Sequence, residues 1–382
     1  YDSTTAGAFE AVASTGGQIM PPIMGAAAFL MAEILEIGYT EVVLAAVIPA
    51  LLYYVAVFVY ADLEAAKKNI EPVPEELIPP LWKTMKEGWF FIIPFAVLIY
   101  ALFSLNRAPE TAALWSGATV VIVNWVFGYK GKRIAPKEII SAVRDTGVRG
   151  GSEIVIIGAM AGLIIGILGA TGLGEALTQA LVTVGESNLA LLLAITAVIC
   201  IVLGMGMPTT AIYLLVSIIA APPLIKLGIN PLAAHMYVFY FGIVSLITPP
   251  VAIAAFVAAN IAGASPMATA VTAVRLGWTA LVVPVMFVLS PNLIMQGNPW
   301  DILIAFVTAV AGVWVTTCGI QGYFVRPLGI VWRTGFMVGG IMLLIPSESF
   351  PNAIYIELSG IILTTILVGR EWIAKRNLAA TT

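Results

Sequence analysis

The sequence predicts an all-α protein that crosses a lipid bilayer several times. Of its 382 residues, 60% are hydrophobic and only 10% carry a charge, and the mean hydropathy is +1.01. Soluble domains carry about 45–50% apolar and about 25% charged residues. The charged residues here are too few to cover a water-facing surface. Soluble enzymes, nucleic-acid binders and disordered chains are therefore excluded.

Single residue types narrow the class of function further. The net charge is −3, so no basic excess points to nucleic acid. Cys200 and Cys318 lie in apolar runs and suit buried small hydrophobes. His235 is the single histidine, and we interpret it as structural, with proton coupling as the alternative. No motif of an intramembrane protease or hydrolase is present, so the protein is not expected to be an enzyme.

Apolar runs of about 20 residues predict the membrane-spanning helices. Lys and Arg favour cytoplasmic loops, and here they gather in residues 62–87 and 129–150 and after the last run. The loop 290–299 has no Lys or Arg, so the C-terminus is expected in the cytoplasm. The predicted spans are 41–61, 88–106, 111–128, 151–170, 188–204, 268–289, 299–317, 330–346 and 351–369.

Two polar segments separate groups of these spans. Residues 62–87 mix charges of both signs with prolines, which is typical of a boundary between two membrane blocks. In residues 134–149, Ile139, Ile140 and Val143 share one helical face. This pattern predicts a short amphipathic helix on the cytoplasmic surface, with a solvated connector as the alternative.

Two Pro-Pro segments in apolar surroundings indicate an internal repeat. Pro21-Pro22 aligns with Pro249-Pro250, and with one residue inserted Glu33 aligns with Asn260. A proline pair removes two backbone donors and forces the preceding residue out of the helical region. Carbonyl groups freed in a membrane need a cavity, an ion or a protein partner. Paired interruptions mark the binding site of inverted-repeat transporters, and a packing kink without ligand is the alternative.

The residues ahead of each break can supply oxygen ligands. Ser14 and Thr15 precede the first break, followed by two glycines, and Ser245 and Thr248 precede the second. A dehydrated Na⁺ prefers hydroxyl and carbonyl oxygens. We therefore expect Na⁺ at the breaks.

A third interruption, residues 203–213, predicts a re-entrant hairpin with a glycine-rich tip. Pro208 is suited to the first turn of the returning helix, and Thr209 and Thr210 follow it. The N-terminus of such a helix favours an anion such as a carboxylate, and a tight turn between two spans is the alternative. The partner hairpin of the first repeat is expected before Tyr1, with residues 4–10 as its returning arm. We therefore expect the chain to be the C-terminal portion of a longer protein.

These segments resemble one family. Residues 13–29 and 62–67 resemble the first transport half of fused permeases of TRAP transporters, TAXI type, and residues 204–210 and 247–252 resemble the second half. The resemblance covers residues 5–290. Residues 330–369 resemble the C-terminal extension of the TAXI branch.

The resemblance implies a Na⁺-coupled importer of the bacterial or archaeal inner membrane. Its transport domain would be an inverted repeat with hairpins and broken helices and would move like an elevator. The expected partners are a periplasmic TAXI-type solute-binding protein, an organic acid (dicarboxylate or amino acid), the lipid bilayer and the missing N-terminal part of the permease. No cofactor is expected besides Na⁺ as coupling ion. A passive channel, or an ion-coupled transporter without a binding protein, is the alternative.

Carried over by position, the resemblance implies two groups of binding residues. The Na⁺ residues would be Ser14, Thr15, Gly16, Gly17, Met20, Gly204, Gly206 and Thr248. The substrate residues would be Pro21, Pro22, Pro208, Thr209, Thr210, Pro249, Pro250 and Asn260.

The predicted organisation has four parts. Residues 1–61 form the first repeat, consisting of a hairpin arm, a broken helix and a span. Residues 62–150 hold a linker, two scaffold-like spans and the amphipathic helix. Residues 151–290 form the second repeat, and residues 291–382 form C-terminal extension spans.

Overall fold

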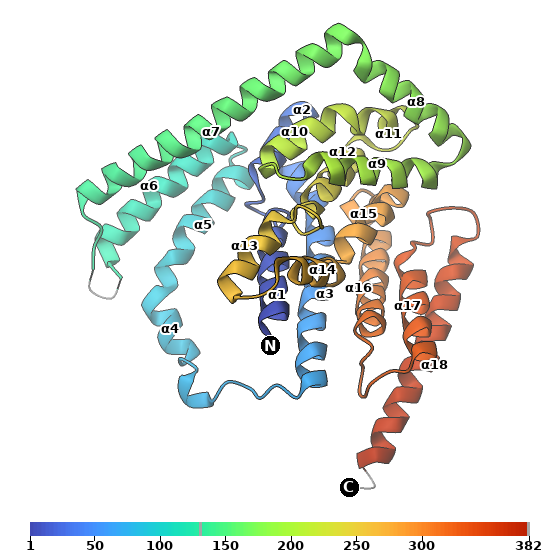
Figure 1. The fold of residues 1–382 in the computed structure, drawn as a ribbon. Helices are drawn as coiled ribbons and strands as arrows, with labels where there is room; N and C mark the ends of the chain where they lie inside the picture. Colours follow the sequence, from blue (N-terminus) through green and yellow to red (C-terminus); the bar gives the residue numbers. More distant parts are fainter. Residues whose placement is uncertain (130–131, 380–382) are drawn as a thin grey trace. The chain divides into compact units, whose positions relative to one another are not determined.

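A computed structural model describes residues 1–129 and 132–379, and within these ranges the regular elements are helical (Figure 1). The β-pairing described there is confined to two isolated bridges. Six of the described helices are long and apolar enough to cross a membrane, and one bent pair adds a seventh candidate. The chain is thus an all-α polytopic membrane protein, as predicted. The six are 39–68, 75–104, 109–127, 266–289, 299–321 and 353–374.

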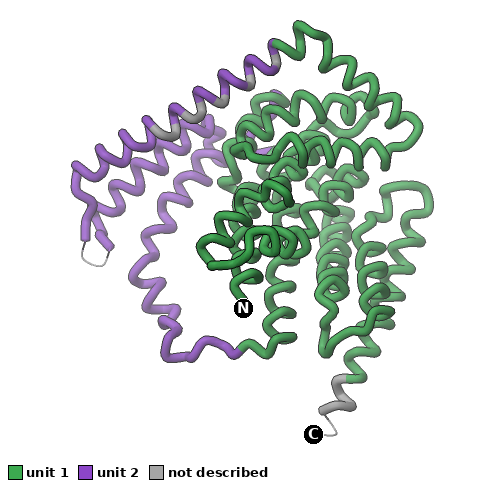
Figure 2. The backbone as a smooth tube through the Cα atoms, viewed as in Figure 1, with its two compact units in different colours: residues 1–35, 42–70, 167–382 green, residues 36–41, 71–166 purple. Residues whose placement is uncertain are grey.

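The chain forms two compact units (Figure 2). Unit 1 comprises residues 1–35, 42–70 and 167–382, and unit 2 comprises residues 36–41 and 71–166. In unit 2, α5 and α6 pack together, and the Ser116 hydroxyl donates to the Pro94 carbonyl at 2.9 Å. The helical elements from residue 71 to 127 are η1 Glu75–Leu77, α4 Leu81–Gly88, η2 Trp89–Phe91, α5 Ile92–Ile99, η3 Tyr100–Ser104 and α6 Pro109–Phe127.

One long helix corrects the predicted amphipathic helix. Helix α7, Pro136–Thr171, continues for 36 residues, so the segment 134–149 and the predicted span 151–170 are not separate elements. The predicted boundary at residue 150 falls inside this helix. Glycine in a helix interior costs about 1 kcal/mol against alanine, which weakens a helix without ending it. The polar composition of residues 134–149 therefore did not mark the end of a helix.

The first repeat in unit 1 is built from α1 Ser3–Gly16, α2 Ala26–Ile34 and α3 Tyr39–Lys68. The helix α1 corrects a second expectation, because residues 4–10 belong to this helix and form no separate hairpin arm. The Asp2 carboxylate caps α1 by accepting a hydrogen bond from the Thr5 amide at 2.8 Å. Such an N-cap satisfies one of the free amide groups of the first turn.

The second repeat begins with α8 and the hairpin helices and continues into a second broken helix. Helix α12 has the same length as α1, and Pro231 and Val244 lie 228 residues after Ser3 and Gly16. Asn230, at the same offset from Asp2, caps α12 in the same way. The elements are α8 Leu173–Ser187, α9 Leu189–Gly204, α10 Thr209–Ile219, α11 Ala221–Lys226, α12 Pro231–Val244, α13 Ile253–Ala262, α14 Pro266–Leu276 and α15 Thr279–Leu289.

The two broken helices run in opposite directions. In Figure 1 the chain passes from α1 upward to α2, whereas it passes from α12 downward to α13. Helix α1 packs against α13 and α14, and α2 packs against α10. Elements of the two repeats therefore form one core, with opposite chain directions as expected for an inverted repeat.

Three helices follow the second repeat, after the short helix η4 Pro291–Ile294. Helices α16 and α17 approach closely at Gly312 and Gly340, because a Cβ atom on either glycine would lie within 2.8 Å of the other's carbonyl oxygen. Helix α18 packs along α17. The three helices are α16 Pro299–Gln321, α17 Ile330–Leu344 and α18 Ala353–Ala379.

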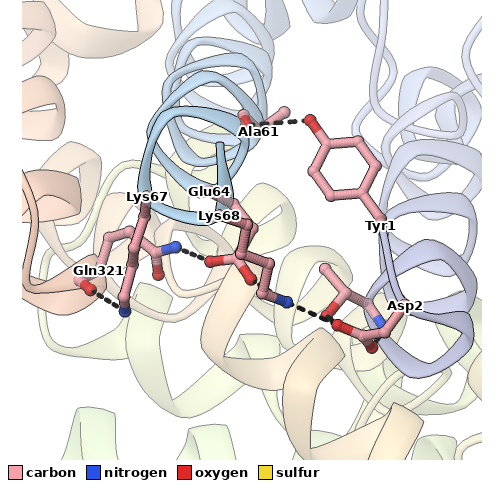
Figure 3. A network of polar contacts seen from close by, with 8 residues as sticks. Tyr1, Asp2, Ala61, Glu64, Lys67, Lys68 and Gln321 are labelled. Carbon is pink, nitrogen blue, oxygen red and sulfur yellow. Dashed lines mark hydrogen bonds and ion pairs between the residues drawn. The ribbon is translucent and has the colours of Figure 1, made fainter. Parts of the chain in front are cut away.

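A polar network joins α1, α3 and α16 (Figure 3). Glu64 is buried; it accepts a hydrogen bond from the Gln321 amide and pairs with Lys68 Nζ at 2.5 Å. Lys68 also pairs with Asp2 at 2.5 Å, and Lys67 Nζ donates to the Gln321 carbonyl at 3.0 Å. The buried carboxylate is thus compensated from two sides, as buried charges require.

Candidate functional site

The first Pro-Pro segment interrupts the helix between Gly16 and Ala26, as predicted. The carbonyl groups near the end of α1 are satisfied from a neighbouring helix. The Tyr53 hydroxyl of α3 donates to the Val12 carbonyl at 2.7 Å, and the Tyr54 hydroxyl donates to the Ala13 carbonyl at 3.0 Å.

The second Pro-Pro segment interrupts the helix between Val244 and Ile253, again as predicted. Here the break supplies its own hydroxyl groups. Ser245 donates to the Gly242 carbonyl at 2.6 Å, and Thr248 donates to the Val244 carbonyl at 2.7 Å. A donating hydroxyl keeps its oxygen lone pairs, so both side chains can still coordinate a cation.

The two breaks share one backbone plan. Three consecutive amides of the first break, from residue 17 to 19, donate to carbonyls three residues earlier, and residues 245–247 do the same. Gln18 and Leu246, which lie 228 residues apart, each accept a closing bond from the start of the following helix, at 2.9 and 3.0 Å. Both Pro-Pro peptide bonds are cis. The sequence repeat is therefore also a repeat of hydrogen bonds.

The glycine-rich segment forms the predicted hairpin, with α9 leading in and α10 leading out. Gly206 has a φ of +82°, a value that glycine adopts without a steric penalty. Pro208 is the N-cap residue of α10, and Thr209 and Thr210 are its first two residues. The amides of this first turn lack intrahelical acceptors, so an oxygen-rich ligand is favoured there.

The hairpin meets both breaks. A Cβ atom on Gly204 would lie 2.6 Å from Ser245 Oγ and 2.8 Å from the Gly242 carbonyl oxygen, so only glycine allows this approach. The Thr209 hydroxyl donates to the side-chain oxygen of Gln18 in the first break. The hairpin therefore contacts the first break about 190 positions away in the sequence and the second break about 40 positions away.

A small, mostly apolar cavity lies beside both breaks. Thr15 and Ile19 of the first break line it together with Ile247 of the second. The Thr15 hydroxyl is buried and donates to the Ala11 carbonyl at 2.7 Å. Its remaining lining residues are Tyr53, Tyr240, Ile243, Val244 and Ala280.

The structure brings most of the predicted binding residues together and leaves some apart. The hairpin tip and the two breaks, with the helix ends that flank them, hold Gly204, Gly206, Pro208, Thr209, Thr210 and the two Pro-Pro segments, and also Thr15, Gly16, Gly17, Met20 and Thr248. Ser14 is exposed, and its hydroxyl donates to Glu10 at 3.1 Å. Asn260 is exposed near the end of α13 and does not lie in the second break.

Several residues of this region were not among the predicted ones. Gln18 had a local signal, because it is a polar side chain three residues ahead of a Pro-Pro pair in an apolar run. Tyr53 and Tyr54 had none, since they lie within a uniform apolar span. His235 is buried, and its Nδ1 lies 2.8 Å from the Tyr213 hydroxyl, which fits the structural role expected for it.

Comparison with known proteins gives a consistent result. A family model described as "Tripartite ATP-independent periplasmic transporter, DctM component" matches residues 1–300. The sialic acid TRAP transporter large permease protein SiaM of Vibrio cholerae serotype O1 is 23% identical over 291 residues. That alignment covers 76% of this chain and 65% of SiaM, so the chain spans just under two thirds of this relative's length. Since the family match extends over most of the chain, the chain belongs to the DctM family of TRAP transporter large permeases.

Proposed function

We propose that the chain forms the transport part of a Na⁺-coupled tripartite transporter that imports an organic acid. The observation that carries this proposal is the meeting of the hairpin tip with both helix breaks. Gly204 packs against Ser245 of the second break, and Thr209 bonds to Gln18 of the first. Broken helices and hairpins that meet in pairs are the usual place where transporters hold substrate and coupling ions.

In this proposal Na⁺ is held at the two breaks. Thr15, Gly16, Gly17 and Met20 would supply oxygens at the first break, with Ser14 at its edge. Gly204, Gly206 and Thr248 would supply them at the second. Hydroxyl and carbonyl oxygens are the ligands that a hard cation prefers, and both breaks are rich in them.

The substrate carboxylate would lie at the start of α10. Thr209 and Thr210 offer hydroxyls there, and the first turn of α10 offers amide donors. The neighbouring Pro-Pro segments would shape the pocket, with Asn260 as a more distant contributor. The relative SiaM belongs to a transporter of sialic acid, which is itself an organic acid. The substrate named for this relative therefore supports an anionic substrate for the chain.

The permease type, its binding protein, its membrane and its mode of movement belong to the same proposal. We assign the chain to a TAXI-type fused permease and to its C-terminal portion, served by a periplasmic TAXI-type binding protein. The protein would lie in the inner membrane with its C-terminus in the cytoplasm, and its transport domain would move like an elevator.

Uptake of organic acid by proteoliposomes tests the proposal, with the complete permease and its binding protein. Thr209→Val and Thr248→Val each remove one hydroxyl at nearly constant volume. Loss of one oxygen ligand costs about 1–3 kcal/mol, so half-saturation should need about tenfold or more Na⁺ in Thr248→Val and about tenfold or more substrate in Thr209→Val. Thr308→Val is the matched control, because Thr308 lies in α16 and its hydroxyl bonds within that helix.

Two outcomes would contradict this proposal. If Thr248→Val keeps the wild-type Na⁺ dependence at normal expression, the ion-site assignment is wrong, and if Thr209→Val keeps the wild-type substrate dependence, the substrate-site assignment is wrong. Flux that does not saturate and ignores the Na⁺ gradient would instead favour a passive channel.

A further inference from the structure

Three glutamates are buried in the part of the chain that the structure describes, and two of them have cationic partners. Glu64 pairs with Lys68, and Glu371 accepts hydrogen bonds from the Arg326 guanidinium at 2.8 and 3.0 Å. Glu357 is 7% exposed, yet none of the described donors contacts its carboxylate. An enclosed carboxylate without a cationic partner favours a cation that can reach it.

Glu357 lines a small cavity at the end of the α16–α18 bundle that is opposite to Arg326. The cavity measures about 50 Å³, which is room for a few water molecules. Asp301 in the first turn of α16 and Glu348 after α17 also line it. Asn292 is buried and donates from its amide nitrogen to Glu348 at 2.5 Å.

The cavity has no positive charge of its own. Its other lining residues are Ser347 and three apolar side chains, so neither Lys nor Arg is among them. Its carboxylates, when ionised, give the cavity a negative potential. A cation bound there would offset this potential and would neutralise Glu357.

We infer that this cavity binds a divalent cation, Ca²⁺ or Mg²⁺, that keeps part of its water shell. Carboxylate and amide oxygens are the ligands that both ions prefer. Within the described residues, no three acidic, histidine or cysteine side chains converge closely enough to enclose a bare ion. An ion bound by one or two carboxylates and several waters fits this spacing, as is usual for Mg²⁺.

The cation would connect elements that are distant in the sequence. Asp301 belongs to α16, Glu357 to α18, and Glu348 to the loop between α17 and α18. All three lie beyond residue 300, where the family match ends, and none belongs to the proposed Na⁺ site. The inference is therefore independent of the transport mechanism.

Thermal unfolding of the purified full chain in detergent tests this site. CaCl₂ or MgCl₂ is titrated at constant NaCl, and the unfolding temperature should rise, saturate and return on addition of EDTA. In Glu357→Gln the half-saturating divalent concentration should rise about tenfold or more, because one charged ligand is lost. Without divalent ions this variant should unfold no earlier than wild type, since it removes an uncompensated buried charge. Glu186→Gln, on the exposed face of α8, is the matched control and should respond as wild type does.

A second variant covers the case in which Glu357→Gln does not fold. Asp301→Asn should raise the half-saturating concentration in the same direction. A wild-type unfolding temperature that neither salt changes would overturn the inference. Equal responses of wild type and Glu357→Gln would do so as well. An unfolding temperature that depends on pH but not on divalent ions would show that protonation neutralises Glu357 instead.

Discussion

The two helix breaks share a backbone plan but differ in what satisfies the carbonyl groups ahead of them. At the first break the donors are Tyr53 and Tyr54, which belong to the neighbouring helix α3. At the second break the donors are Ser245 and Thr248, which belong to the break itself. Helices α14 and α15 follow the second break as α3 follows the first, and neither contains a tyrosine.

This difference shows how a duplicated backbone can acquire two environments. Besides its own backbone bonds, the first break receives two hydrogen bonds from α3, so its geometry is held partly from outside. The second break satisfies its own carbonyls, which leaves its outer side free for the hairpin tip at Gly204. The two breaks should therefore respond differently to equivalent changes.

The largest effect is expected for Gly204→Ala. The added Cβ would lie 2.8 Å from the Gly242 carbonyl oxygen, and backbone cannot move aside easily. Overpacking of this kind costs about 1–3 kcal/mol, so we expect a lower unfolding temperature and a severe loss of uptake in proteoliposomes. Gly117→Ala is the control, because its Cβ would meet nothing within 4 Å.

A glycine at the end of α1 sharpens this prediction. In Gly16→Ala the new Cβ would lie 2.5 Å from the buried Tyr53 ring, which is a side chain and not backbone. Its effect should therefore be smaller than that of Gly204→Ala. Equal losses of stability and uptake would mean that the two breaks are not held differently.

Removal of the Tyr53 hydroxyl should have the next largest effect. Tyr53→Phe removes a buried hydrogen bond to the Val12 carbonyl, which keeps only its partner within α1, at a cost of about 1–2 kcal/mol. The measurement is the unfolding temperature of the purified protein. Tyr54→Phe should cost less, because that bond is only partly buried. Tyr355→Phe, on an exposed ring of α18, should change nothing.

Ser245→Ala should cost less than Tyr53→Phe. The Gly242 carbonyl loses the serine hydroxyl but still accepts a bond from the Ser245 amide, so about 0.5–1 kcal/mol is expected. The same change removes one of the two atoms that would collide with a Cβ on Gly204. In a double-mutant cycle, Ser245→Ala should therefore relieve part of the defect of Gly204→Ala. Additive losses in the cycle would count against the direct contact.

The smallest effect concerns the caps of α1 and α12. Hydrogen bonds from Lys68 and Thr5 hold the pKa of Asp2 well below its usual range. A lowered folded-state pKa adds stability that is complete above the unfolded value of about 4 and is lost as the pH falls below it. Asp2→Asn should cost at most about 1 kcal/mol at pH 7, since the pair is exposed, and should reduce the acid-dependent loss of stability. Asn230, the equivalent cap of α12, cannot titrate. A pH profile of unfolding unchanged by Asp2→Asn would refute this account.

Local chemistry made part of this structure predictable. Proline removes a backbone donor wherever it stands, so the breaks at residues 17–25 and 245–252 followed from the sequence, as did the hairpin tip. Most span positions followed from apolar length. The continuous helix α7 did not, because its polar first half resembles a surface helix.

Contacts between distant residues could not be predicted in this way. The bond between Tyr53 and Val12 joins residues 41 positions apart, and that between Thr209 and Gln18 joins residues 191 positions apart. No periodicity or spacing specifies such pairs, since they depend on how the helices pack. The contacts of Glu64 with Gln321 and of Glu371 with Arg326 were hidden for the same reason, whereas the pair of Glu64 with Lys68 has the ordinary spacing of one helical turn.

The network around Glu64 has a consequence for the modularity of the chain. The family match ends at residue 300, so by sequence the last three helices form a separate C-terminal extension. Yet Gln321, at the end of α16, is a partner of both Glu64 and Lys67 in α3. Removal of these three helices would uncover the buried Glu64 carboxylate in the part of the chain that matches the family. A different C-terminal extension would need a residue equivalent to Gln321. Exchange of C-terminal extensions between such permeases is therefore expected to work only when the end of α3 is exchanged with them.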